Sequence, residues 1–222
     1  MVEFFVDTAN KDEIREAASY GFVTGVTTNP KIFSQEGNVS HKDHILDIID
    51  ILDGPVSVET IATDKEGMIK EALEYSEWHK NVVIKFPVGI PCFKAMKELQ
   101  GSGIKTNITA CMSMSQALLA ALNGATYVSL FYGRIGDLGF DPNIVVKETS
   151  DILKKNNLES KIIVGSIRSL NDINRAVVSG GDVMTVPFKF LSKLSENPQT
   201  DVTIKEFTDA WNAVHAWKTV NK

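Results

Sequence analysis

A single lysine interrupts the otherwise apolar segment NVVIKFP at residues 81–87. Lys85 follows a β-branched run and precedes Phe86, so its amine is expected among hydrocarbon side chains. Burial disfavours the ammonium form, and an uncharged lysine amine attacks carbonyl carbons to give a Schiff base. Taken alone, Lys85 also fits a rim residue whose stem covers apolar surface while its amine reaches water. Other reactive groups in the same enclosure would favour the chemistry.

Carboxylates end two other apolar runs, Asp7 in FFVDT at 4–8 and Glu59 in VSVET at 56–60. A Schiff base with a carbonyl substrate is an electron sink that permits cleavage of a neighbouring carbon–carbon bond. One carboxylate could take the hydroxyl proton that drives cleavage, and the other could work through a water molecule during imine formation and hydrolysis. A carboxylate too close to Lys85 would instead hold the lysine charged, so the distances decide the outcome.

Eight short β-branched or aromatic runs recur along the chain, at 4–8, 25–29, 56–60, 82–87, 104–110, 127–131, 162–167 and 183–187. Helical patterns lie at 10–21, 63–78, 114–124 and 169–181, the second opening with an expected capping box from Thr63 to Glu66. Apolar strands that alternate with amphipathic helices predict parallel pairing. We therefore expect an α/β fold, a (β/α)8 TIM barrel. A doubly wound open sheet is the alternative, although no strand is followed by a dinucleotide-binding or P-loop glycine motif.

Polar residues gather late in seven of these runs, where the mouth of a parallel barrel lies. The candidates are Asp7, Thr28, Asn29, Glu59, Lys85, Asn107, Thr109, Ser129, Ser166 and Arg168. Residues two apart on a strand share a face, so Ser129 with Phe131 and Ser166 with Arg168 are expected to be same-side pairs. Together with Arg134 in YGRIGDLG, Ser166 and Arg168 suggest an anion site, because guanidinium groups suit phosphate. Both arginines could equally pair with surface carboxylates.

The composition favours a globular protein that acts on a small molecule. The net charge is −5 and both signs are interspersed, so no basic stretch suits nucleic acid or a membrane surface. Cys92 and Cys111 are too few for a disulfide framework, and the N-terminal segment lacks the pattern of a secretory signal. We expect a cytoplasmic protein with free thiols. His41 and His44 are expected on a solvated helix face, and no metal site is proposed.

No linker or composition shift divides the chain, so residues 1–222 are expected to form one domain. The apolar spacing at about 201–222 predicts a C-terminal helix that packs on the barrel or on a neighbouring subunit. Its apolar stripe comprises Ile204, Phe207, Trp211, Val214 and the stem of Lys218, with Trp217 and Val220 beside it. We interpret this face as a packing surface rather than a cofactor site.

The chain resembles the short transaldolases and fructose 6-phosphate aldolases over essentially its whole length. The matching segments, in order, are FFVDTAN, GVTTNPKI, VVIKFPV, TNIT, ATYVSLFYGRI, GSIRS and VMTVPFKFL. The resemblance implies a (β/α)8 barrel with a Schiff-base lysine and no metal or cofactor, assembled as a homo-oligomer, a pentamer or a decamer. It implies transfer of a dihydroxyacetone unit from fructose 6-phosphate or sedoheptulose 7-phosphate to an aldose phosphate, erythrose 4-phosphate or glyceraldehyde 3-phosphate.

The resemblance also implies a role for each site residue. Lys85 is the expected nucleophile, Asp7 the acid/base at the cleaved bond, and Glu59 and Thr109 the holders of the catalytic water. The substrate contacts are expected from Asn29, Thr28, Asn107, Ser129 and Phe131 around the dihydroxyacetone portion, and from Arg134, Ser166 and Arg168 at the phosphate.

Two residues favour the transaldolase branch of this resemblance. The aldolase branch carries Gln at the position of Glu59 and Tyr at that of Phe131, whereas transaldolases carry Glu and Phe. A phenol could help to protonate the enamine and release dihydroxyacetone, and Phe131 cannot. The loop Val88 to Cys92 departs from the family's usual Thr and Gly, which affects the expected acceptor preference. A fructose 6-phosphate aldolase and a non-catalytic phosphosugar-binding protein are the alternatives.

Overall fold

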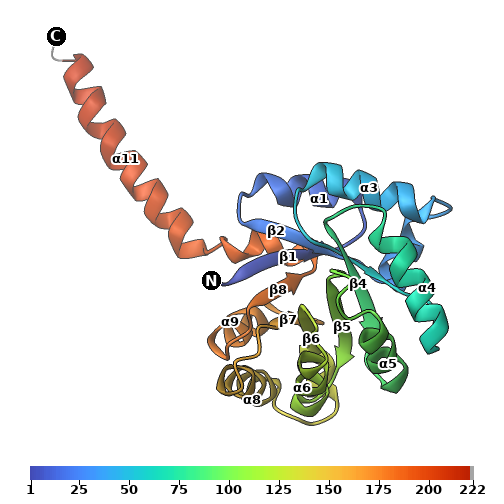
Figure 1. The fold of residues 1–222 in the computed structure, drawn as a ribbon. Helices are drawn as coiled ribbons and strands as arrows, with labels where there is room; N and C mark the ends of the chain where they lie inside the picture. Colours follow the sequence, from blue (N-terminus) through green and yellow to red (C-terminus); the bar gives the residue numbers. More distant parts are fainter. Residues whose placement is uncertain (221–222) are drawn as a thin grey trace. The chain divides into compact units, whose positions relative to one another are not determined.

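Eight parallel strands close into a barrel in a computed structural model that describes the backbone of residues 1–220 and the side chains of residues 1–214 (Figure 1). The strands are β1 (Glu3–Asp7), β2 (Val23–Thr27), β3 (Val56–Glu59), β4 (Val82–Pro87), β5 (Thr106–Cys111), β6 (Tyr127–Phe131), β7 (Lys161–Gly165) and β8 (Val183–Val186). Each strand pairs with the next in sequence, and β8 pairs with β1. The predicted (β/α)8 barrel is confirmed, and the doubly wound sheet is excluded.

Helices follow the strands around the outside of this barrel (Figure 1). They are α1 (Lys11–Ser19), α2 (Pro30–Phe33), α3 (His41–Ile51), α4 (Lys65–Ser76), α5 (Ile90–Glu98), α6 (Met114–Leu122), α7 (Tyr132–Asp137), α8 (Pro142–Lys155), α9 (Leu170–Val178) and α10 (Phe188–Leu191), with a 3-10 turn η1 (Ser34–Glu36) after α2. The capping box expected at Thr63 is wrong, because Asp64 caps α4 by accepting from the amide of Gly67. The capping box is found instead on α9, between Ser169 and Asp172.

An apolar layer fills the barrel below its carboxyl-end mouth. Phe5, Val83, Tyr127, Ile163 and Val183 form a cluster of buried side chains. Each residue that lies two positions further along β1, β4, β6 or β8 is polar and points to the same face of its strand. The apolar cluster therefore lies directly beneath the polar side chains of the mouth and packs against them.

Two histidines on α3 depart from the solvated face expected for them. His44 is buried, with Nε2 2.7 Å from the carbonyl oxygen of Ala9. The ring of His41 packs edge-on against those of Phe33, Tyr75 and Trp78, and burial lowers its pKa. The expectation failed because contacts from α2 and α4 cover this part of α3.

Both cysteines are free and fully buried. Burial raises the pKa of the Cys92 and Cys111 thiols to about 12, so the reactive thiolate is scarce near neutral pH. Cys92 lies in the first turn of α5, which begins directly after the unusual loop at 88–89.

The chain from Ser192 onward forms a second compact unit. It contains η2 (Ser192–Leu194) and α11 (Pro198–Val220), which confirms the predicted C-terminal helix. Within the described side chains, the stripe of Ile204, Phe207, Trp211 and Val214 is exposed. The stripe positions Trp217, Lys218 and Val220 lie outside the described side chains, and the packing partner of this face stays a prediction.

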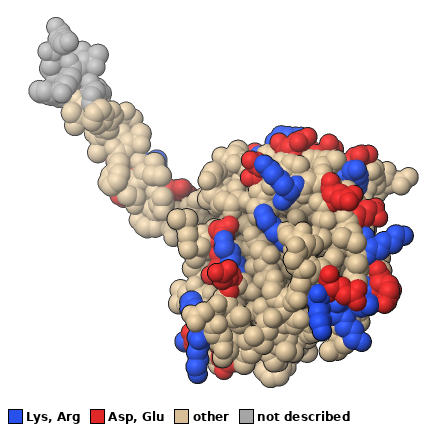
Figure 2. Space-filling view, viewed as in Figure 1, with Lys and Arg blue, Asp and Glu red and all other residues tan. Residues whose placement is uncertain are grey.

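Charged side chains of both signs mingle over the face of the barrel that is shown in Figure 2. No extended basic surface is visible on that face. Among residues 1–220, none of the helices combines the length and the apolar character that crossing a bilayer requires.

Candidate active site

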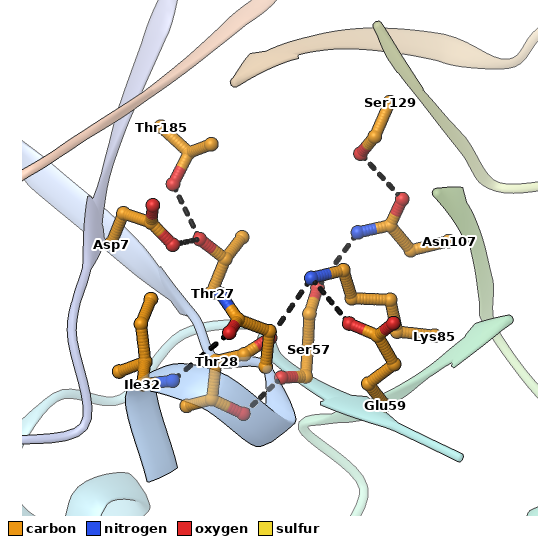
Figure 3. Close-up of polar contacts among 11 residues, drawn as sticks. Asp7, Thr27, Thr28, Ile32, Ser57, Glu59, Lys85, Asn107, Ser129 and Thr185 are labelled. Atoms are coloured by element: carbon orange, nitrogen blue, oxygen red, sulfur yellow. Dashed lines mark hydrogen bonds and ion pairs between the residues drawn. The ribbon is translucent and has the colours of Figure 1, made fainter. Parts of the chain in front are cut away.

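Strand register brings Lys85 beside two other polar residues. Lys85 on β4 pairs with Glu59 on β3 and with Asn107 on β5. Its side chain is only 6% exposed, and its Nζ lies 2.9 Å from Oε2 of Glu59. The same nitrogen donates a hydrogen bond of 3.0 Å to the carbonyl oxygen of Thr28 (Figure 3). Lys85 is therefore a buried residue of the mouth rather than a rim residue.

The contact with Glu59 changes how the amine becomes reactive. A carboxylate at 2.9 Å stabilises an ammonium group, which opposes the effect of the apolar strand. It is also within proton-transfer reach of Nζ. The sequence left the effect of a nearby carboxylate to be decided by its distance, and at 2.9 Å Glu59 can accept the proton as Nζ attacks a carbonyl.

Asp7 ends β1 on another side of the same space (Figure 3). Thr27 donates a hydrogen bond of 2.8 Å to Oδ1 of Asp7, and the hydroxyls of Thr27 and Thr185 are 2.5 Å apart. Burial raises the pKa of Asp7, against the positive charge of Lys85 and the hydrogen bond from Thr27, which lower it. A carboxyl group with a raised pKa suits proton exchange with a substrate.

A chain of hydrogen bonds fixes the amide of Asn107. Ser129 donates to Oδ1 of Asn107 at 2.7 Å, and Nδ2 of Asn107 donates to Oγ of Ser57 at 3.1 Å. Asn107 is fully buried, so this network sets the direction of its second N–H. Ser57 was missed by the sequence reasoning, although its place two residues before Glu59 puts it on the same face of β3.

Thr109 carries a buried hydroxyl oxygen with no partner among the described residues. An unpaired buried hydroxyl costs free energy, and Thr109 lines the same cavity as Lys85. The next residue, Ala110, has a φ of 59°, in the left-handed region, and the pairing of β5 with β6 shifts there. The Thr109 hydroxyl is thus available to a substrate or to water.

A central cavity of about 140 Å³ lies between Lys85 and Asp7. Its lining residues are Asp7, Thr27, Asn29, Lys85, Thr109, Ser129, Phe131, Arg134, Gly165, Ser166 and Thr185. An outer cavity of about 550 Å³ shares Asn29, Phe131 and Arg134 with it and adds Glu59, Lys31 and Gln35 among others. Lys31 was missed by the sequence reasoning, although it lies within the quoted GVTTNPKI segment.

Two of the expected substrate residues in the GVTTNPKI segment use their side chains in the fold. The Thr28 hydroxyl donates to the carbonyl oxygen of Ser57 at 2.8 Å. Asn29 Oδ1 accepts from the amide of Ile32 at 3.0 Å, which caps α2. Asn29 nevertheless lines both cavities, and its amide N–H groups are unaffected by the cap.

The three expected phosphate residues do not meet in one cavity. Arg134 and Ser166 line the central cavity, and the Arg134 guanidinium lies 5.5 Å from the centre of the Phe131 ring. Arg168 lines a separate cavity of about 350 Å³ and is paired with Asp137. The expected same-side geometry fails because β7 ends at Gly165 and Ser166 has a φ of 58°, which breaks the strand alternation.

Comparisons with known proteins identify relatives over nearly the whole chain. A sequence model described as Transaldolase/Fructose-6-phosphate aldolase matches residues 4–221. A "Probable transaldolase" from Carboxydothermus hydrogenoformans is 43% identical over 213 residues, covering 96% of this chain and 99% of its own length. A "Probable transaldolase" from Desulforudis audaxviator is 44% identical over 210 residues, covering 95% of this chain and 97% of its own.

Solved structures show a likeness of fold alone. An arginine-to-lysine mutant of flavocytochrome b2 matches with a TM-score of 0.60 and 17% identity, covering 86% of this chain. This chain spans 58% of that protein's length. The specific relationship thus comes from the sequence, and over nearly all of its length this chain belongs to the transaldolase/fructose-6-phosphate aldolase family.

Proposed function

We propose that the protein is a transaldolase that moves a dihydroxyacetone unit from a ketose phosphate to an aldose phosphate. The donor is fructose 6-phosphate or sedoheptulose 7-phosphate, and the acceptor is erythrose 4-phosphate or glyceraldehyde 3-phosphate. The observation that carries the proposal is a buried lysine whose Nζ is 2.9 Å from Glu59, within a cavity that Asp7 also lines. Family membership supports the same chemistry.

The reaction begins at the Lys85 amine. Its ammonium proton passes to Glu59, and the freed nitrogen attacks the carbonyl carbon C2 of the donor. The resulting carbinolamine takes up a proton at its hydroxyl, loses water and becomes a protonated imine. Thr109, with its unpaired hydroxyl in the cavity, would hold that water together with Glu59.

Cleavage then needs a base at the C4 hydroxyl. Ionised Asp7 accepts that proton, the bond between C3 and C4 breaks, and its electron pair moves into the imine to give an enamine. The shortened aldose phosphate leaves. An acceptor aldehyde next takes the electron pair of the enamine C3, Asp7 returns a proton to the new hydroxyl, and water hydrolyses the imine. Lys85 thus supplies the nucleophile, and Asp7 and Glu59 supply the proton transfers.

Substrate binding is assigned to the polar side chains around the lysine. Asn107, Ser129 and Asn29 would hold the hydroxyls of the dihydroxyacetone unit, since the first two are joined by a 2.7 Å hydrogen bond beside Lys85. Arg134 and Ser166 would bind the phosphate, because both line the central cavity and an arginine fork with a hydroxyl suits that anion.

Trapping with borohydride tests the mechanism. The protein is incubated with fructose 6-phosphate, reduced with borohydride and digested, and the peptides are mapped by mass. We expect a dihydroxyacetone-derived addition on Lys85 and none in Lys85→Met, whose side chain cannot form an imine. An unmodified Lys85 in the wild-type protein would overturn the proposal. Binding of fructose 6-phosphate by a wild-type protein that shows no transfer activity would instead favour a phosphosugar-binding role for this cavity.

The aldolase alternative is separated by its dependence on an acceptor. Release of free dihydroxyacetone needs a proton donor at the enamine, and Phe131 presents a hydrocarbon ring to the cavity. We expect turnover of fructose 6-phosphate to require erythrose 4-phosphate. We also expect Phe131→Tyr to increase acceptor-independent release of dihydroxyacetone. Equal turnover without an acceptor in the wild-type protein would favour the aldolase.

We further propose that the enzyme works in the cytoplasm, in the pentose phosphate pathway, as a homo-oligomer. The family resemblance suggests a pentameric ring or a decamer. The exposed apolar stripe on α11, with Phe207 at 71% exposure, supports an interface role, since large exposed apolar patches mark interaction surfaces.

A further inference from the structure

The carboxylate of Glu59 has one polar contact among the described residues. Its Oε2 lies 2.9 Å from Nζ of Lys85 (Figure 3), and no amide or hydroxyl of the described chain donates to it. In the proposed reaction that nitrogen becomes bonded to the substrate, so it no longer holds Glu59 as an ammonium group does. The place of the carboxylate during these steps then depends on the backbone at the end of β3.

The backbone just after Glu59 is bonded to a second carboxylate, that of Glu71 in the middle of α4. The amide of Ile61 donates to Oε2 of Glu71 at 2.7 Å, and the amide of Ala62 lies 3.2 Å from both carboxylate oxygens. The loop also passes so close to the helix that an added Cβ on Gly67 would lie 2.6 Å from Cβ of Ala62. Hydrogen bonds to an ionised acceptor are stronger than those between neutral groups, so Glu71 ties the loop after β3 to α4.

This part of the loop has little other anchorage. The side chain of Ile61 is 62% exposed, so its burial does not fix the backbone. On the strand side, the amide of Thr60 donates to the carbonyl oxygen of Lys85 at 3.0 Å, which continues the pairing of β3 with β4. On the helix side, Glu71 supplies the attachment. The two attachments together set the direction in which the chain leaves Glu59.

We propose that Glu71 is a positioning residue for Glu59, which it serves by holding the loop after β3 on α4. The catalytic carboxylate thereby stays within reach of Lys85 and of the water that leaves and returns. Glu71 lines neither the central nor the outer cavity, so it acts only through the loop. This role rests on the proposed function, which assigns the proton transfers of imine formation to Glu59.

The two carboxylates of the site act at different steps, which makes the role of Glu71 measurable. Glu59 works in the formation and hydrolysis of the imine, whereas Asp7 works in the cleavage and formation of the carbon–carbon bond. A displaced Glu59 therefore slows the first pair of steps and leaves the second pair unchanged. A general loosening of the barrel would slow all of them.

The experiment follows the modification of Lys85 over time in the wild-type protein and in Glu71→Leu, which lacks an acceptor for the loop amides. Each protein is mixed with fructose 6-phosphate and quenched with borohydride after set intervals, and its peptides are mapped by mass. Two adducts differ in mass, that of the whole sugar phosphate and that of dihydroxyacetone. Their sum reports imine formation, and the conversion of the first into the second reports cleavage.

We expect imine formation in Glu71→Leu to be about tenfold slower, within the roughly hundredfold that a displacement of about 1 Å can cost. Conversion of the first adduct into the second should change by less than about twofold, because the base at that step is Asp7. The value of kcat/KM for fructose 6-phosphate should fall by at most the same factor as imine formation. Glu71→Gln keeps an oxygen that accepts from the Ile61 amide and should recover most of the lost rate.

Glu74→Leu is the matched control. Glu74 lies on the same helix, and its charge acts on His41 and Tyr75 as that of Glu71 does. The loop amides, however, bond to Glu71, so the loss of Glu74 should leave imine formation unchanged. Thermal unfolding of every variant checks that the fold is retained.

Two results would overturn this role of Glu71. One is imine formation in Glu71→Leu at the wild-type rate. The other is an equal slowing of imine formation and of cleavage, which would show a general loosening of the barrel. The wild-type protein separates the two proposals. An unmodified Lys85 there would overturn the proposed function and the role of Glu71 with it, whereas equal labelling of wild type and Glu71→Leu would overturn the role of Glu71 alone.

Discussion

The Asp7 carboxyl group must be ionised for catalysis, although its burial disfavours the ionised form. Burial raises its pKa, while the charge of Lys85 and the hydrogen bond from Thr27 hold the rise in check. As the base that takes the C4 proton, Asp7 must be ionised in the free enzyme. The surrounding groups therefore set the lowest pH at which the enzyme can cleave its substrate.

The first prediction concerns Thr27. The pKa that governs the acidic limb of the kcat/KM profile should lie above 3.8, the ordinary pKa of an Asp side chain. Thr27→Val removes the hydroxyl that stabilises the Asp7 carboxylate, so the pKa of Asp7 rises and the limb moves to higher pH. Thr185→Val is the control, because the Thr27 bond to Asp7 survives it. A limb that stays in place in Thr27→Val would show that another group controls it.

The second prediction concerns the free energy of unfolding, which the buried Asp7 carboxylate lowers. The raised pKa of Asp7 means that, between the unfolded and folded pKa values, the folded protein holds a proton that the unfolded chain has lost. The free energy of unfolding therefore falls as the pH rises through this window. Asp7→Asn keeps an acceptor for Thr27 and carries no charge. We expect it to be inactive and about 0.5–2 kcal/mol more stable at pH 7, the common size of a stabilising substitution.

Urea unfolding of wild type and Asp7→Asn over a range of pH measures this difference. It should shrink as the pH falls below the folded pKa of Asp7, because the wild-type carboxyl is then neutral as well. A destabilised Asp7→Asn at pH 7 would mean that the attraction to Lys85 outweighs the cost of burial.

At the scale of elements, β2 shows that the apolar layer beneath the site requires a glycine at one position. Gly25 faces Phe5 so closely that an added Cβ would lie 2.7 Å from the ring. Phe5 belongs to the apolar layer beneath the polar groups and is fully buried. A ring in such a layer cannot move without disturbing its neighbours.

The third prediction follows from this contact. Gly25→Ala should lower the free energy of unfolding by about 1–3 kcal/mol, because the methyl group overpacks the barrel against Phe5. Gly136→Ala is the matched control, since an added Cβ on this residue of α7 meets nothing within 4 Å. It should be neutral or stabilising by up to about 1 kcal/mol, the gain of Ala over Gly in a helix. Equal effects of the two substitutions would contradict the packing argument.

Sequence patterns predicted the strands well because buried parallel strands are apolar along their length. Alternation also predicted the site wherever a strand continues, as on β6, where Ser129 and Phe131 both line the central cavity. It failed just beyond β7, because a left-handed Ser166 is not recognisable from residue type. The 2.9 Å distance between Glu59 and Lys85 could not be predicted from the sequence either, since it depends on the register of two strands.

At the scale of the whole molecule, the barrel unit contains every residue assigned to the chemistry, and α11 contains none. Helix α11 instead presents large apolar side chains, with Ile204 at 57% and Phe207 at 71% exposure. Exposing such residues to water is unfavourable, so a surface that covers them would gain free energy. The expected homo-oligomer supplies such a surface.

The last prediction tests this role in solution. The double variant Ile204→Glu/Phe207→Glu places two charges in the apolar stripe and should lower the assembly to one chain of 24.4 kDa, measured by size exclusion with light scattering. Burying unpaired carboxylates in an interface costs several kcal/mol, enough to outweigh the apolar contact. Lys205→Glu changes the charge of the same helix on its other side, where Lys205 lies near Asp209, and should leave the mass of the oligomer unchanged. A wild-type protein that is already a single chain would contradict the oligomer, and an intact oligomer in the double variant would move its interface away from α11.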